Sequence, residues 1–141
     1  MDIELTTNPS PEDAAVLLKG LVDYNNTQNP ELLNEHSTKL FLFVRNNKNN
    51  IIGGLRASGH WNTLHIEIVW LDEAHRHQKI GTELMKKAEA FATERGYSNI
   101  FLDTTSWQAK GFYEKLGYEL MATIPDRPKG CATYYFNKRL L

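Results

Sequence analysis

The sequence has little cysteine, no long apolar run and almost no net charge, and each shortage excludes a class of protein. Cys131 is the only cysteine in 141 residues, so no disulfide joins two parts of the chain. A membrane-spanning helix needs a run of about 18 apolar residues, and none is present. The net charge at pH 7 is −1, which argues against the basic surface of a nucleic-acid-binding protein.

We also expect no signal peptide. Polar residues follow Met1 directly, where a signal peptide would have a basic and then an apolar segment. We therefore expect a cytoplasmic protein whose partners include neither membranes nor nucleic acids.

Motifs for nucleotides and metals are missing as well. Neither the P-loop pattern Gly-x-x-x-x-Gly-Lys-Ser/Thr nor the dinucleotide pattern Gly-x-Gly-x-x-Gly occurs. His75 and His77, together with His60 or His65, offer imidazoles, but no cysteine or acid completes a recognised spacing of zinc ligands. The sequence therefore predicts no metal site.

What is present indicates one α/β domain over residues 1–141, because the chain is 41% hydrophobic and 23% charged. Ser10 followed by Pro11 predicts a helix that runs to about Tyr24, since serine caps helices and proline suits the first helical position. The spacing of apolar residues predicts the other elements. These are a short helix at 31–35, strands at 39–44, 51–57, 64–71 and 99–104, helices at 80–94 and 108–116, and strands at 118–124 and 132–138.

The most informative segment is 76–82, Arg-His-Gln-Lys-Ile-Gly-Thr, which lies between an apolar strand and an amphipathic helix. The first N–H groups of a helix have no partner within the helix, and the helix dipole adds positive potential there. The segment therefore suggests a phosphate site. The alternative is a solvated basic turn, and the segment alone favours it.

A second motif is Phe-Tyr-Glu-Lys-Leu-Gly-Tyr at 112–118. Phe112 and Leu116 lie four residues apart on one helical face, and Gly117 allows the chain to leave the helix in a left-handed conformation. Tyr113 need not belong to that apolar face, so its hydroxyl is available for another role.

The two motifs, in this order and spacing, resemble the GNAT acyltransferase superfamily. Arg76 to Gly81 matches its acyl-CoA motif Arg/Gln-x-x-Gly-x-Gly/Ala except at Lys79, where the family usually has glycine. The resemblance covers nearly the whole chain. It implies a mostly antiparallel mixed sheet of about six to seven strands with about four helices. It also implies transfer of an acetyl group from acetyl-CoA to an amine, and a homodimer.

The resemblance also implies which residues bind acetyl-CoA. Lys79 should adopt an ordinary backbone conformation with its side chain pointing outward, because it is not glycine. Its side chain either contacts a phosphate or is solvated. Ser106 stands at a cofactor-contacting position of the family, or else caps the following helix. The implied cofactor-binding residues are Val69, Trp70, Leu71, Arg76, His77, Gln78, Lys79, Ile80, Gly81, Thr82 and Ser106.

Catalysis requires a base for the amine and an acid for the leaving thiolate. The family places this acid at Tyr113, although the residue can also be read as a core aromatic. Glu67 is the first candidate for the base and His65 the second, because both alternate with Leu64, Ile66 and Ile68 along one strand. Both can equally be polar residues of a partly exposed strand.

The acceptor is expected to be a small-molecule or peptide amine. Candidates for its pocket are His60, Trp61, Trp107 and segment 126–129. An alternative function, supported by Lys79, is a catalytically weak acyl-CoA sensor or regulatory module.

Overall fold

A computed structural model describes residues 1–76, 79–107 and 110–140, which form two compact units, residues 1–35 and residues 36–141. The first unit contains helix α1 (Pro11–Gln28) and the 3-10 helix η1 (Pro30–Asn34). The Ser10 hydroxyl accepts a hydrogen bond from the Asp13 amide at 3.1 Å, so the predicted helix start is confirmed. The helix continues one turn beyond the predicted end at Tyr24, and none of its residues is buried.

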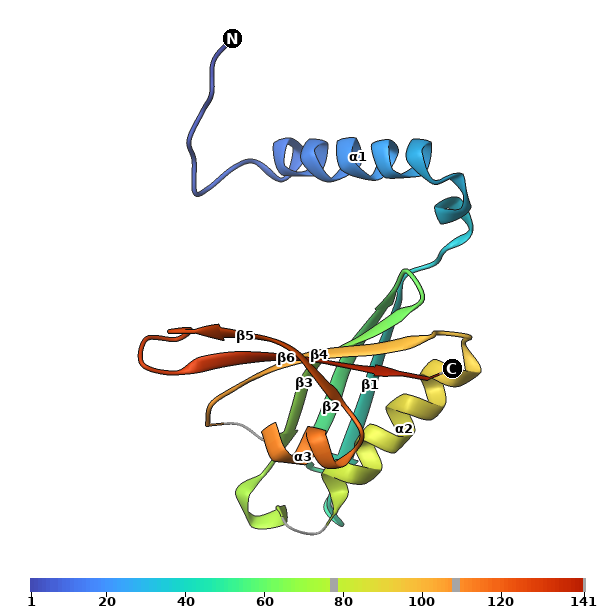
Figure 1. The fold of residues 1–141 in the computed structure, drawn as a ribbon, viewed down its shortest axis with the longest axis vertical. Helices are drawn as coiled ribbons and strands as arrows, with labels where there is room; N and C mark the ends of the chain where they lie inside the picture. The colour runs from blue at the N-terminus through green and yellow to red at the C-terminus, as the bar shows by residue number, and fades with distance from the viewer. Residues whose placement is uncertain (77–78, 108–109, 141) are drawn as a thin grey trace. The chain divides into compact units, whose positions relative to one another are not determined.

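The second unit contains a six-stranded sheet in the order β1-β2-β3-β4-β6-β5 (Figure 1). Among the described residues, β3 pairs with β4 in parallel and the other pairs are antiparallel. The predicted mixed α/β fold is confirmed. The strands are β1 (Thr38–Arg45), β2 (Ile51–His60), β3 (Thr63–Leu71), β4 (Asn99–Thr105), β5 (Glu119–Pro125) and β6 (Ala132–Arg139).

Two α-helices cover one face of this sheet. Helix α2 (Ile80–Glu94) buries Leu84, Met85, Ala88 and Ala92 against the sheet, as its helical spacing predicts. Helix α3 (Lys110–Lys115) adds Tyr113 to the same core. In the described residues the chain has these three α-helices and two 3-10 helices, η1 and η2 (Glu73–His75). No helix of the described residues is long and apolar enough to cross a membrane.

Strand β3 contains a β-bulge that the sequence did not predict. Ala57 of β2 is opposite Ile66, but the next residue, Arg56, is opposite Ile68, so Glu67 is an additional residue in β3. A bulge of this kind shifts the alternation of side chains beyond it. Ile68 is therefore 45% exposed, whereas Leu64 and Ile66 are buried. The prediction that Ile68 shares their face is wrong for this reason.

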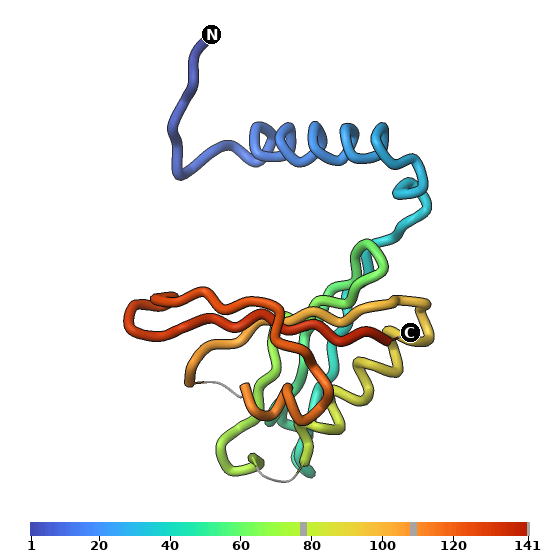
Figure 2. Tube along the Cα trace, viewed as in Figure 1, coloured from blue at the N-terminus to red at the C-terminus, as the bar shows by residue number. Residues whose placement is uncertain are grey.

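The bulge lies where the sheet divides. Residues Thr63 to Ile66 pair with Asn99 to Leu102, and the pairing between β3 and β4 ends there. Beyond this point β3 continues beside β2, and β4 continues beside β6. Because bulges bend a strand and increase its twist, the bulge gives a physical reason for this separation. Figure 2 shows the traces of β1–β3 and of β4–β6 running in different directions.

Candidate active site

A cleft of about 960 Å³ lies where β3 and β4 separate. It is bordered by the second half of β3, the end of β4, the start of α2 and helix α3. Its lining includes Glu67, Val69, Trp70, Leu71, Arg76, Lys79, Ile80, Gly81, Thr82, Asp103, Trp107 and Tyr113.

A continuous stretch of β3 lines the cleft, because Ile66 to Leu71 all border it. Beyond Ile66, β3 is paired with β2 alone, so its other edge faces the cleft. Such an edge offers backbone N–H and C=O groups to an extended ligand.

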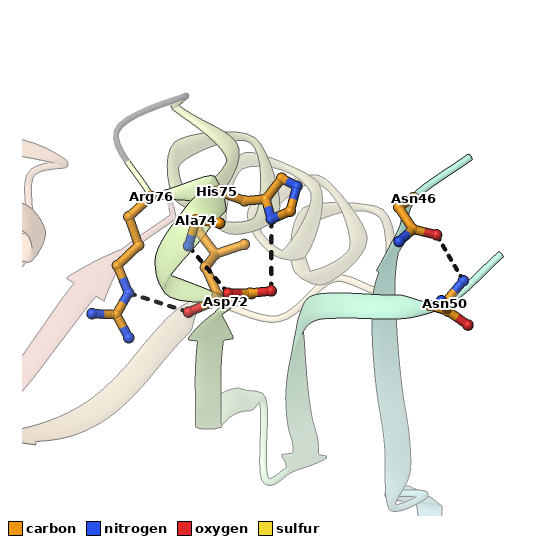
Figure 3. A network of polar contacts seen from close by, with 7 residues as sticks. Asn46, Asn50, Asp72, Ala74, His75 and Arg76 are labelled. Carbon is orange, nitrogen blue, oxygen red and sulfur yellow. Dashed lines mark hydrogen bonds and ion pairs between the residues drawn. The ribbon is translucent and has the colours of Figure 1, made fainter. Parts of the chain in front are cut away.

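The turn after β3 is held by Asp72 (Figure 3). Its carboxylate accepts a hydrogen bond from the Ala74 amide at 3.1 Å, and its other oxygen lies 3.8 Å from Nδ1 of His75. The Asp72 amide donates to the carbonyl of Ile52 at 2.8 Å. These contacts anchor η2 to the sheet and so determine where the chain enters α2.

Arg76 follows this turn and lines the cleft. Its Nε donates to the Leu71 carbonyl at 3.2 Å. This bond places the guanidinium beside the end of β3. Figure 3 shows Arg76 next to the turn that Asp72 holds. Arg76 and Lys79 make this end of the cleft basic, which suits an anionic group. His77 and Gln78 lie outside the described residues.

Lys79 is the N-cap of α2 and has a left-handed backbone conformation, with φ 60° and ψ 15°. The prediction of an ordinary conformation is therefore wrong. Lys79 stands where the family usually has glycine, and its backbone has the left-handed conformation that favours glycine. The side chain is exposed and borders the cleft. The first amides of α2 thus begin at the basic end of the cleft, where helix geometry favours an anion.

Gly81 permits a close contact between the two helices that border the cleft. A Cβ atom at this position would lie 3.3 Å from Cζ of Phe112. This distance is tighter than ordinary van der Waals contact, so a larger residue would displace the Phe112 ring or the first turn of α2.

Tyr113 brings a phenol into the cleft from α3. The residue is 9% exposed, and its ring packs against Phe112, Tyr118 and Phe136. Its hydroxyl makes no hydrogen bond within residues 1–76, 79–107 and 110–140. Burial raises the pKa of Tyr113 to about 12, because the phenolate is poorly solvated there. The hydroxyl therefore stays protonated near neutral pH and is able to donate a proton.

The two candidate bases occupy different positions. Glu67 lines the cleft, and its Oε1 lies 3.3 Å from Nε of Arg56. His65 is not among the lining residues; its Nε2 lies 3.7 Å from Oδ1 of Asp103, which does line the cleft. Arg56 and Asp103 were not found from the sequence, because both depend on strand register.

The remaining predicted residues have varied positions. Trp107 borders the cleft and is 64% exposed. Ser106 instead joins β4 to β6, since its hydroxyl accepts from the Ala132 amide at 2.7 Å and donates to the Ala132 carbonyl at 3.2 Å. His60 and Trp61 lie at the β2–β3 turn, at the other end of β3 from Leu71. No group of three possible metal-ligating side chains occurs in the described part of the chain.

Comparison with known proteins identifies the family. The chain matches the model of the acetyltransferase (GNAT) family over residues 7–118. It is 36% identical over 94 residues to blasticidin-S acetyltransferase from Streptomyces morookaense. The aligned segment covers 66% of this chain and 69% of the relative. The chain therefore belongs to the GNAT acetyltransferase family.

Solved structures agree with this assignment. An acetyltransferase from Bacillus cereus ATCC 14579 has a TM-score of 0.87 and 31% identity, over 96% of this chain and 97% of that chain. The PaiA N-acetyltransferase of Thermoplasma acidophilum, solved in complex with coenzyme A, shares the fold with a TM-score of 0.62 and 22% identity, over 72% of this chain and 60% of that one.

Proposed function

We propose that this acetyltransferase transfers an acetyl group from acetyl-CoA to the primary amine of a small molecule, with Tyr113 as the general acid. The observation that carries the proposal is the composition of one cleft. It has a basic end at Arg76 and Lys79 and an open strand edge along β3, and its lining includes the phenol of Tyr113 and the carboxylates of Glu67 and Asp103.

Acetyl-CoA fits this arrangement by its chemistry. Its phosphates suit the basic end and the first amides of α2, from Lys79 to Thr82. Its amide-containing arm suits the free edge of β3 at Val69 to Leu71, which can bind an extended chain as a sheet edge does. The thioester would then lie toward the point where β3 and β4 separate.

The amine must lose protons during the reaction. Alkyl amines have pKa values of about 10.4 and are mostly protonated near neutral pH. Glu67, which lines the cleft as His65 does not, is the proposed base and takes a proton from the ammonium group. The neutral nitrogen then attacks the thioester carbonyl, a C–N bond forms and the C–S bond breaks.

Tyr113 completes the proton balance. The departing thiolate receives the phenolic proton of Tyr113, and the phenolate is reprotonated by solvent. The nitrogen loses two protons in all, and the CoA thiol gains one. The reaction therefore releases one proton to solvent. The products are an N-acetylated amine, CoA and one proton.

The nature of the acceptor is supported by the Streptomyces relative, whose name gives blasticidin S as the molecule that it acetylates. A small-molecule amine agrees with this relative. Asp103, Glu67 and Trp107 supply charge and apolar surface for such a molecule at the cleft.

Thiol release from acetyl-CoA in the presence of a panel of small amines, blasticidin S included, tests the proposal. Tyr113→Phe should lower kcat by about 10²- to 10⁴-fold, because general acid catalysis contributes about that much. Tyr97→Phe is a matched control, since Tyr97 is also a buried core tyrosine but does not line the cleft. An unchanged kcat in Tyr113→Phe would remove Tyr113 from this role. If none of the amines in the panel caused thiol release, the proposed acceptor class would be contradicted.

A further inference from the structure

The point where the sheet divides is flanked by two carboxylates. Ile66 and Leu102 form the last pair between β3 and β4. The next residue of each strand is acidic, Glu67 on β3 and Asp103 on β4, and both line the cleft. A ligand that reaches the innermost part of the cleft therefore meets an acidic side chain from each strand.

The two carboxylates have different partners. Glu67 lies 3.3 Å from the Arg56 guanidinium, which is charged at all ordinary pH values. Asp103 lies 3.7 Å from Nε2 of His65. The His65 ring also packs against Phe101, with centroids 5.0 Å apart, which restricts its orientation.

The position of His65 limits what it can contact. Its Nε2 is shielded from solvent and makes no hydrogen bond among the described residues, so Asp103 is the polar group it faces there. The Asp103 side chain is 41% exposed and reaches the cleft, whereas His65 does not line it. The imidazole is thus placed behind Asp103, and Asp103 faces any bound molecule.

We propose that Asp103 binds the nitrogen of the acceptor amine opposite Glu67, and that His65 is a positioning residue for Asp103. This inference rests on the proposed function, because it concerns the acceptor of that reaction. An ammonium group has three N–H donors, enough for a hydrogen bond to each carboxylate. After one proton is lost, a remaining N–H still donates to Asp103, and this bond directs the lone pair of the nitrogen.

The inference also defines the chemical class that the cleft selects. A protonated alkyl amine donates to the Asp103 carboxylate a hydrogen bond in which both partners are charged. An alcohol of the same length can donate to the carboxylate but brings no positive charge, so it lacks the attraction between opposite charges. The cleft should therefore bind alkylammonium ions in preference to neutral molecules of equal size.

Binding of n-butylammonium, with 1-butanol as the neutral comparison, tests this inference without any transfer. The protein is first saturated with CoA, which carries no acetyl group, and binding is followed by NMR titration. Asp103→Asn should weaken the binding of n-butylammonium about tenfold, as expected for loss of a charged hydrogen bond. It should leave CoA affinity and melting temperature unchanged. Glu94→Gln removes an exposed carboxylate at the far end of α2 and serves as the matched control.

The role of His65 has its own measurement. His65→Gln should weaken n-butylammonium binding without changing CoA affinity, since it alters only the position of Asp103. Equal n-butylammonium affinity in wild-type and Asp103→Asn protein would overturn the inference, and so would equal affinity of the wild-type protein for butylammonium and butanol. The thiol-release assay tests the proposed function separately, because binding in this experiment needs no turnover.

Discussion

Lys79 combines a side chain that suits phosphate with a backbone conformation that suits glycine. A non-glycine residue in the left-handed region is disfavoured by about 1 to 2 kcal/mol, because Cβ approaches the following carbonyl. The chain retains this unfavourable residue at the entrance to α2, on the border of the cleft. In the proposed reaction, stability and acetyl-CoA binding therefore make opposite demands on this position.

We predict that Lys79→Gly raises the free energy of unfolding by about 1 kcal/mol or less, since relief of strain is partly offset by the greater freedom of unfolded glycine. Acetyl-CoA affinity should fall several-fold, with a weaker dependence on salt, if the ammonium contacts a phosphate. Urea unfolding and calorimetric titration measure the two effects. Lys79→Ala is the matched control, because it removes the charge but keeps the strained backbone. Equal acetyl-CoA affinity in all three proteins would mean that the Lys79 side chain is solvated.

Helix α3 depends on contacts from outside itself. It has six residues, too few for a stable isolated helix. Nζ of Lys138 on β6 donates to the Leu116 carbonyl at 2.9 Å and to Oε1 of Glu89 on α2 at 2.7 Å. The Tyr118 hydroxyl donates to the other oxygen of Glu89 at 3.3 Å. This network fixes the helix that carries Tyr113.

Lys138→Met should therefore affect stability and catalysis together. We expect a loss of about 2 kcal/mol of unfolding free energy, because Glu89 and the Leu116 carbonyl lose a charged donor while both side chains of the ion pair remain partly exposed. The kcat should fall by a larger factor than the KM for acetyl-CoA rises, since Tyr113 loses its position. Denaturant unfolding and steady-state kinetics measure these changes.

Lys115→Met provides the comparison for this variant, as Lys115 is an exposed lysine of α3 itself. A double-mutant cycle with Glu89→Gln isolates the coupling between Lys138 and Glu89. A coupling near zero would contradict the importance of this ion pair.

The extents of most elements were predictable from local chemistry, whereas the partners of the site residues were not. Ser10 and Pro11 mark the start of α1 because capping depends on adjacent residues, and the apolar spacing of α2 predicts its buried face. The face occupied by Ile68 depends on a bulge opposite Arg56, and such register is a property of two strands. Asp103 was missed for the same reason, since its relation to Glu67 appears only once β3 and β4 are paired.

The stability of the whole molecule should decrease at alkaline pH. Burial raises the pKa of Tyr113 to about 12. Burial also raises the pKa of Tyr118, as do the Glu89 carboxylate and the nearby Tyr113. Because an unfolded tyrosine ionises near pH 10, the folded protein binds more protons than the unfolded chain above that value. The stabilisation from Tyr113 is complete below about pH 10 and is lost as the pH rises toward about 12.

Tyr113→Phe should make this decrease less steep, since phenylalanine has no proton to lose. Urea unfolding at a series of pH values above about 9 measures the slope, and the same series near neutral pH separates it from any packing change. Tyr118→Phe should reduce the slope further. An identical slope in wild-type and variant protein would show that Tyr113 does not contribute to the alkaline loss.

The length of β3 along the cleft has a consequence for the order of events in the proposed transfer. Ile66 to Leu71 all border the cleft, with Arg76 at the Leu71 end of this stretch and the carboxylates of Glu67 and Asp103 at the Ile66 end. In the proposed arrangement acetyl-CoA and the amine arrive from opposite ends, and neither has to wait for the other to bind or leave. For such a geometry, CoA as product should compete with acetyl-CoA for its own entrance while leaving the entrance of the amine open.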